Sequence, residues 1–119
     1  MADVTIKRFD DLESYSGEGR FRYAAKSLGV SSWGMNILHL PAGWSDYPDH
    51  DHTKDGQEEV YVVLDGSASL QAGTETFALE PGLLARVGPG QKRKIVPGPN
   101  GVTLLAIGGT PGKAYTPRS

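Results

Sequence analysis

Turns containing glycine or proline recur along this chain at intervals too short for long helices. The chain has 119 residues, of which 16 are Gly and 8 are Pro. The turns separate short apolar runs and fall at Pro41-Ala42-Gly43, Asp65-Gly66, Ala72-Gly73-Thr74, Pro81-Gly82, Pro89-Gly90 and Pro99-Asn100-Gly101. Runs of this length between such turns are typical of β-strands. About eight short strands at near-regular spacing predict an all-β fold, either a small barrel or a jelly roll.

The predicted strands begin after a polar N-terminal stretch. Residues 1–20 are predicted to form an arm laid on the domain, with a turn of helix near residues 10–13, and residues 21–119 to form one barrel domain. Asp65-Gly66 is predicted to be the turn of a hairpin. After Phe21 and Tyr23, the expected strands are Trp33–Leu40, Glu58–Leu64, Ser67–Gln71, Glu75–Leu79, Leu83–Val87, Lys92–Val96 and Val102–Ile107.

Charge and composition argue against several functional classes. The net charge is −2, and no basic stripe exists beyond Lys92-Arg93-Lys94, so we expect no nucleic-acid partner. The absence of cysteine excludes a disulfide framework, a thiol nucleophile and a cysteine-based zinc site. No apolar run approaches about 18 residues, and the N-terminal stretch has no apolar segment typical of a secretion signal. We therefore expect no membrane association and a cytoplasmic protein.

The predicted strand Glu58–Leu64 has two apolar faces. Because side chains alternate in a strand, Glu59, Tyr61 and Val63 share one face, and Glu58, Val60, Val62 and Leu64 share the other. Both faces must then be covered. The first can line a barrel interior, whereas the second needs another sheet, the N-terminal arm or another subunit. We therefore expect a homodimer, with the chain's own arm as the alternative cover.

A short histidine motif points to a metal site. His50 and His52 are separated by one residue, which places both imidazoles on one face of an extended segment. A carboxylate from the start of the next strand, Glu58 or Glu59, can converge on the same point. Two imidazoles and one carboxylate suit Fe(II), Mn(II), Ni(II) or Zn(II) and leave positions open for substrate.

Other polar and aromatic residues are weaker candidates. His39 ends a predicted strand and is expected to be structural, while Asp49 and Asp51 alternate with the histidines and should face solvent. Asp51 could instead orient a neighbouring ligand. Packing is the expected role of the aromatic residues, and Tyr61 is the best candidate for a pocket wall. The aromatic residues considered are Trp33, Trp44, Tyr47 and Tyr61.

At these residues the chain resembles the cupin family. The first cupin motif is matched in order by Gly43, His50, His52, Glu59 and Gly66, with the expected six residues between the last two. The second is matched from Gly82 through Gly88-Pro89-Gly90 to Arg93. Glu59 is preferred over Glu58 because it keeps the spacing to Gly66, although the gap after His52 is longer than the family pattern. The resemblance implies a single small cupin jelly-roll barrel.

Arg93 stands where the family places its fourth metal ligand, normally histidine. An arginine stays protonated and does not bind metal ions. Arg93 is predicted to face inward together with Ile95. It could contact an anionic substrate on an ion held by His50, His52 and Glu59, or it could form an ion pair with Glu59 in a metal-free site.

Two functions follow from this pattern. The first is a metal-dependent enzyme acting on a small polar or anionic metabolite, for which the resemblance implies dioxygenase, isomerase/epimerase or cyclase chemistry. There Arg93 would stabilise negative charge and Tyr61 would donate a proton. The second is a non-enzymatic cupin that binds a small ligand through Arg93 and the aromatic lining, without metal. An interaction module acting through the outer strand face is a third reading.

Overall fold

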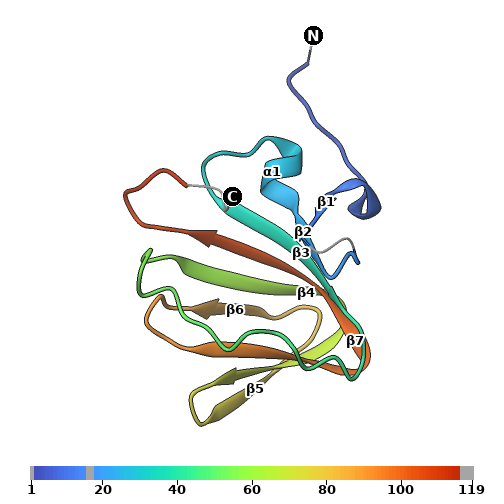
Figure 1. Ribbon diagram of the computed structural model, residues 1–119, viewed down its shortest axis with the longest axis vertical. Coiled ribbons are helices and arrows are strands. Elements are labelled where there is room, and N and C mark those ends of the chain that lie inside the picture. Colours follow the sequence, from blue (N-terminus) through green and yellow to red (C-terminus); the bar gives the residue numbers. More distant parts are fainter. Residues whose placement is uncertain (1, 16–17, 116–119) are drawn as a thin grey trace.

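The fold consists of two long strands with shorter elements arranged around them. The computed structural model describes residues 2–15 and 18–115 (Figure 1). The long strands β4 (Glu58–Ala72) and β7 (Arg93–Gly109) pair with each other in antiparallel fashion. The shorter strands are β1 (Glu13–Ser14), β2 (Phe21–Tyr23), β3 (Gly34–Leu40), β5 (Glu75–Leu79) and β6 (Leu84–Val87). The sheet order is β1-β2-β3-β7-β4-β5, and β6 also pairs with β4.

Both long strands bend, so that each serves two parts of the sheet. The first half of β4 lies between β6 and the last half of β7, whereas its second half lies between β5 and the first half of β7. The register of β4 against β7 shifts between Val63 and Asp65 and again between Gly66 and Ala68. Such irregularities bend a strand and increase its twist. The prediction of an all-β fold is confirmed.

The predicted hairpin at Asp65-Gly66 is wrong. The chain does not reverse there, because residues on both sides of the bend pair with β7. The predicted strands 58–64 and 67–71 are therefore one strand, β4. Gly66 has φ +77° and lies against the backbone of Gly101, where an added Cβ would overlap the carbonyl oxygen. The predicted strands 92–96 and 102–107 are likewise one strand in the structure. Glycine here marks a bend, not a chain reversal.

The main core lies on the inner face of the bent sheet. Tyr61 and Val63 are buried there, as predicted for the face that lines the interior, while Val60, Val62 and Leu64 on the alternate positions remain partly exposed in the single chain. The other buried members come from β3 to β7 and from the segment between β3 and β4: Leu38, Leu40, Tyr47, Ala68, Leu70, Leu79, Val87, Ile95, Val102, Leu104 and Ala106.

The N-terminal part of the chain packs on the outer face of the sheet. A 3-10 turn η1 (Phe9–Asp11) and a short helix α1 (Ala24–Leu28) flank β1 and β2. Leu12 and Ala24 bury Ile37 of β3, forming a second small cluster with Met35 and Leu105. The helix α1 was not predicted, because five residues ending at Gly29 are too short for a clear period. None of the described helices has the length and apolar character needed to cross a membrane.

The bend at Gly66 yields a stability prediction. Gly66→Ala should lower the free energy of unfolding by more than about 3 kcal/mol. The new Cβ would overlap backbone atoms of Gly101, and alanine would have to adopt a positive φ. Gly73→Ala is the matched control, since Gly73 has φ +64° but nearly open space around it, and should cost about 1–2 kcal/mol. Urea unfolding followed by circular dichroism measures both. Equal losses would contradict the role of Gly66.

Candidate metal centre

The two histidines lie in the segment between β3 and β4, which is held against the start of β7. The His50 N–H donates to the Arg93 carbonyl (3.0 Å), and the Arg93 N–H donates to the His50 carbonyl (2.8 Å). The His52 N–H donates to the carbonyl of Pro89 (2.8 Å). These bonds give the segment an extended conformation, so both imidazoles project to the same side, with ring centroids 5.1 Å apart.

Each imidazole is oriented through its Nδ1 atom. His50 Nδ1 lies 3.0 Å from the carbonyl oxygen of Pro48, and His52 Nδ1 lies 3.1 Å from a carboxylate oxygen of Asp55. Both partners only accept hydrogen bonds, so Nδ1 carries the proton in each ring. The two Nε2 atoms therefore face the site, at 3.7 Å and 3.2 Å respectively from Oε1 of Glu59.

Glu59, not Glu58, lies with the histidines. Glu59 projects from the inner face of β4, whereas Glu58 projects outward and accepts a hydrogen bond from Arg86 (3.0 Å). The Tyr61 hydroxyl donates to Glu59 Oε1 (2.9 Å), and the Tyr47 hydroxyl lies 3.3 Å from that of Tyr61. Because the Tyr61 hydroxyl donates its proton to Glu59, the Tyr47 hydroxyl is the donor in the hydrogen bond between the two tyrosines. Two phenols in series thus hold the carboxylate.

The three groups fit a first-row divalent ion. The two histidine nitrogens and one carboxylate oxygen all lie within 4.8 Å of one another, and each of the three side chains is partly buried. Ligand bonds of about 2.1 Å place neighbouring ligand atoms about 3–3.5 Å apart, which is close to the 3.2 Å and 3.7 Å that separate Glu59 Oε1 from the two histidine nitrogens. Hydrogen bonds at both Nδ1 atoms are the usual support for metal-binding histidines.

The surroundings of the three groups favour an ionised Glu59. The neighbouring Glu59 carboxylate raises the pKa of His50 above its usual value, despite the opposing effect of burial. Burial raises the pKa of Glu59, but His50, His52, Tyr61 and Arg93 outweigh it, and the net shift is downward. Burial also raises the pKa of Tyr47 to about 12 and raises that of Tyr61 further, so both phenols stay protonated. An anionic Glu59 is therefore available to a cation.

Arg93 lies behind Glu59 and is 0% exposed. Its Nη2 atom donates to the carbonyl of Gly88 (3.1 Å) and lies 3.8 Å from Glu59 Oε1. Within the described residues, its Nε and Nη1 atoms are buried with no hydrogen-bond partner. Ile95 on the same face is also buried, which confirms the predicted inward register. Arg93 is absent from the described lining of the cavity, so it acts on the site through Glu59.

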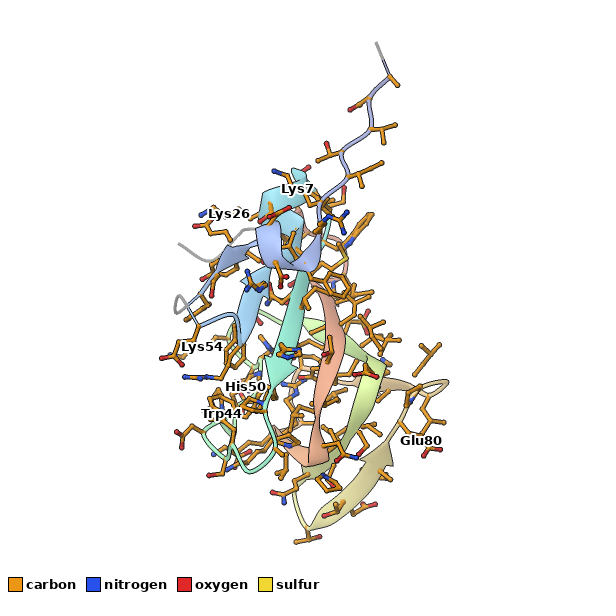
Figure 2. The ribbon with its side chains drawn as sticks, turned by 90° about the vertical axis from the view of Figure 1, so that its right-hand side faces the viewer. Lys7, Lys26, Trp44, His50, Lys54 and Glu80 are labelled. Carbon is orange, nitrogen blue, oxygen red and sulfur yellow. The ribbon has the colours of Figure 1, made fainter. Side chains whose placement is uncertain are left out.

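A cavity of about 870 Å³ opens in front of the three groups. Figure 2 shows His50, Trp44 and Lys54 on one side of the molecule. Trp44 contacts Phe21 edge-on and lies under the guanidinium of Arg20 (5.2 Å to the ring centroid). The volume and the mixed lining suit a small metabolite. Besides these residues, the wall includes Asn36, Leu38, Tyr47, Gln57 and Ala106.

The other residues considered in the sequence analysis lie outside the group of three metal-ligand candidates. His39 bonds Thr103 (2.7 Å) and is not part of the cavity lining, and Trp33 is exposed on the outer face. Asp51 is exposed and lines the cavity, and it accepts hydrogen bonds from the backbone and side chain of Thr53, not from a histidine. Asp55, which orients His52, was missed by the sequence reasoning. Its position three residues after His52, within a turn, was the available signal.

Comparison with known proteins establishes the fold. No family model and no curated protein matches the chain. A cupin protein from Bacteroides fragilis superposes with a TM-score of 0.74 at 24% identity, covering 98% of this chain and 93% of that one. A sugar phosphate isomerase of the cupin superfamily from Silicibacter pomeroyi gives 0.65 at 23%, covering 74% and 57% respectively. The cupin domain of Schizosaccharomyces pombe Cnp3 gives 0.57 at 18%, covering 76% and 65%. The protein has a cupin fold.

The role of Asp55 can be tested by its effect on ion affinity. Asp55→Ala should weaken divalent-ion binding about 10–100-fold, because His52 would lose the group that orients its ring. Asp51→Ala is the matched control: Asp51 also accepts the N–H two residues on, but it contacts neither histidine. Isothermal titration with Zn(II) and Mn(II) measures both variants. Equal weakening would assign the effect to the loop and not to His52.

Proposed function

We propose that this protein binds a divalent first-row metal ion through His50, His52 and Glu59 and acts on a small polar or anionic metabolite. The observation that carries the proposal is the orientation of the imidazoles. Both Nδ1 atoms are engaged by acceptors, so both Nε2 lone pairs point at one carboxylate oxygen. Lone pairs facing a carboxylate repel it unless a cation lies between them. A proton or a metal ion satisfies this arrangement.

The chain's own residues would prepare the site for chemistry. A bound ion would polarise a substrate oxygen or activate O₂ or water. Tyr61 and Tyr47 hold Glu59 in place, and the aromatic wall of Phe21 and Trp44 excludes water from one side of the cavity. Arg20 and Lys54 line the cavity together with the carboxylates of Asp46, Asp51 and Asp55, so charged groups of both signs are available to a polar metabolite. Dioxygenase, isomerase/epimerase and cyclase reactions all accept this arrangement, and the isomerase among the structural neighbours has the same fold.

Arg93 favours a second candidate function. A guanidinium 3.8 Å from the ligand carboxylate repels a divalent ion and can replace it as the partner of Glu59. In that case the protein would be a non-enzymatic cupin that binds a small ligand in the cavity without metal. We favour the metal-dependent function because Arg93 Nη2 is committed to the carbonyl of Gly88, so its contact with Glu59 is long.

Metal content separates the two functions. Protein purified without chelator and loaded with Fe(II), Mn(II), Ni(II) or Zn(II) should retain about one ion per chain by mass spectrometry, and His52→Ala should lose it. His39→Ala is the matched control, since His39 bonds Thr103 away from the site, and it should retain the ion. Failure of the wild type to retain any ion would support the metal-free ligand-binding function.

Substitution of Arg93 tests its electrostatic role. Arg93→Met removes the charge at similar volume and should raise ion affinity at least about tenfold. Arg93→His should raise it further, because an imidazole adds a fourth ligand as well. Titration of both variants against the wild type gives the ratio, and thermal unfolding reports whether they fold. An unchanged affinity in both folded variants would show that Arg93 does not oppose ion binding.

A further inference from the structure

We infer that Gln57 is a specificity-determining residue, whose side-chain oxygen Oε1 accepts a hydrogen bond from a hydroxyl or amino group of the metabolite. Gln57 directly precedes β4 and lies two positions before Glu59, so both side chains project from the same face. Gln57 also lines the cavity. The inference rests on the proposed function, because it takes a small metabolite at the ion as the occupant of the cavity.

The amide of Gln57 is oriented by the same carboxylate that orients His52. Gln57 Nε2 donates to Oδ2 of Asp55 (3.2 Å), and the Gln57 N–H donates to Oδ1 (3.1 Å). Because a carboxylate only accepts hydrogen bonds, the amide nitrogen faces Asp55 and the amide oxygen points elsewhere. Among the residues that the structure describes, no donor is bonded to Oε1. The oxygen is therefore available to a donor from outside the chain.

Gly108 of β7 provides the space that this oxygen occupies. Gly108 pairs with Glu59 on one side and with Gly34 of β3 on the other, and the three strands lie side by side (Figure 1). Directly opposed residues of antiparallel strands share a face of the sheet, so these three form one row on the inner face. An added Cβ at Gly108 would overlap Oε1 of Gln57. The φ of Gly108 is not positive, so a larger residue would displace the amide without straining the backbone.

The amide oxygen consequently lies one strand away from the backbone of Glu59. Neighbouring strands are about 4.8 Å apart, so a molecule bound to an ion at Glu59 reaches the space over Gly108 within a few bonds. On the other side, the ring of Tyr115 lies over Gly34, 2.6 Å from the position of an added Cβ, and lines the cavity. An amide oxygen pairs with a hydroxyl or amino group and not with a carbonyl or a carboxylate. The class of metabolite that fits is a small hydroxy acid or amino acid, with its donor a few bonds from the carboxylate.

A purely structural role for Gln57 makes a different prediction. If the amide served only to hold Asp55, its replacement would weaken the binding of every ligand of the ion alike. A hydrogen bond accepted by Oε1 instead affects only those ligands that carry a donor. Two acids that differ by one hydroxyl or amino group therefore isolate the contact with Oε1.

Isothermal titration of the Zn(II)-saturated protein with propionate, lactate and alanine provides the test. The wild type should bind lactate, the hydroxyl probe, or alanine, the amino probe, more tightly than propionate, and Gln57→Leu should reduce that preference about fivefold. Gly108→Ala should reduce it as well, because the new Cβ displaces Oε1 while the amide remains present. Direct binding of the ion by the hydroxyl or amino group contributes equally in each protein, so it cancels when the preferences are compared.

Two matched controls should keep the preference of the wild type. Gln71→Leu makes the same substitution at an exposed position on the second half of β4, and Gly109→Ala adds a Cβ where nothing lies within 4 Å. A wild type that prefers neither lactate nor alanine to propionate, or a preference that survives in both Gln57→Leu and Gly108→Ala, would overturn the inference. Zn(II) retention is measured first: a wild type that holds no ion contradicts the metal-dependent function, and the same titrations of the ion-free protein then decide the role of Gln57.

Discussion

The carboxylate of Glu59 is the charge around which this molecule is organised. A charged group buried in a protein core requires partners, and those of Glu59 come from three separate parts of the chain. His50 and His52 come from the segment after β3, Tyr61 from β4 itself and Arg93 from β7. The long segment between β3 and β4 has no regular structure of its own, and its position depends on these contacts and on three backbone bonds to residues 89 and 93.

The same carboxylate determines which ligands the cavity can accept. With neutral imidazoles, Glu59 and Arg93 leave the group without net charge. A divalent ion added to that group introduces a surplus of two positive charges in a partly buried place, where it costs most. An anionic metabolite that reaches the ion would reduce this surplus. A metal centre containing Arg93 would therefore suit an anionic ligand better than a neutral one.

Much of this arrangement could be predicted from the sequence, and the exceptions share a physical cause. Period-two patterns and the separation of two histidines are local signals, and they predicted the strands and the convergence of His50, His52 and Glu59. The bend at Gly66 was misread as a hairpin because glycine permits both, and only the pairing of β7 on both sides decides between them. Asp55 and the carbonyl of Gly88 act through turns, whose geometry no periodicity reveals.

The bend at Gly66 also connects the fold to the site. A shift of one residue in β4 would exchange its two faces, so Glu58 would enter the core and Glu59 would face solvent with Val63. Both faces of this strand carry valines, so hydrophobic burial alone discriminates weakly between the two registers. The close contact of Gly66 with Gly101 admits no side chain, and Val102 pairs directly with Gly66. That contact, together with the register shift between Val63 and Asp65, determines where the first half of β4 lies on β7 and hence that Glu59 meets the histidines.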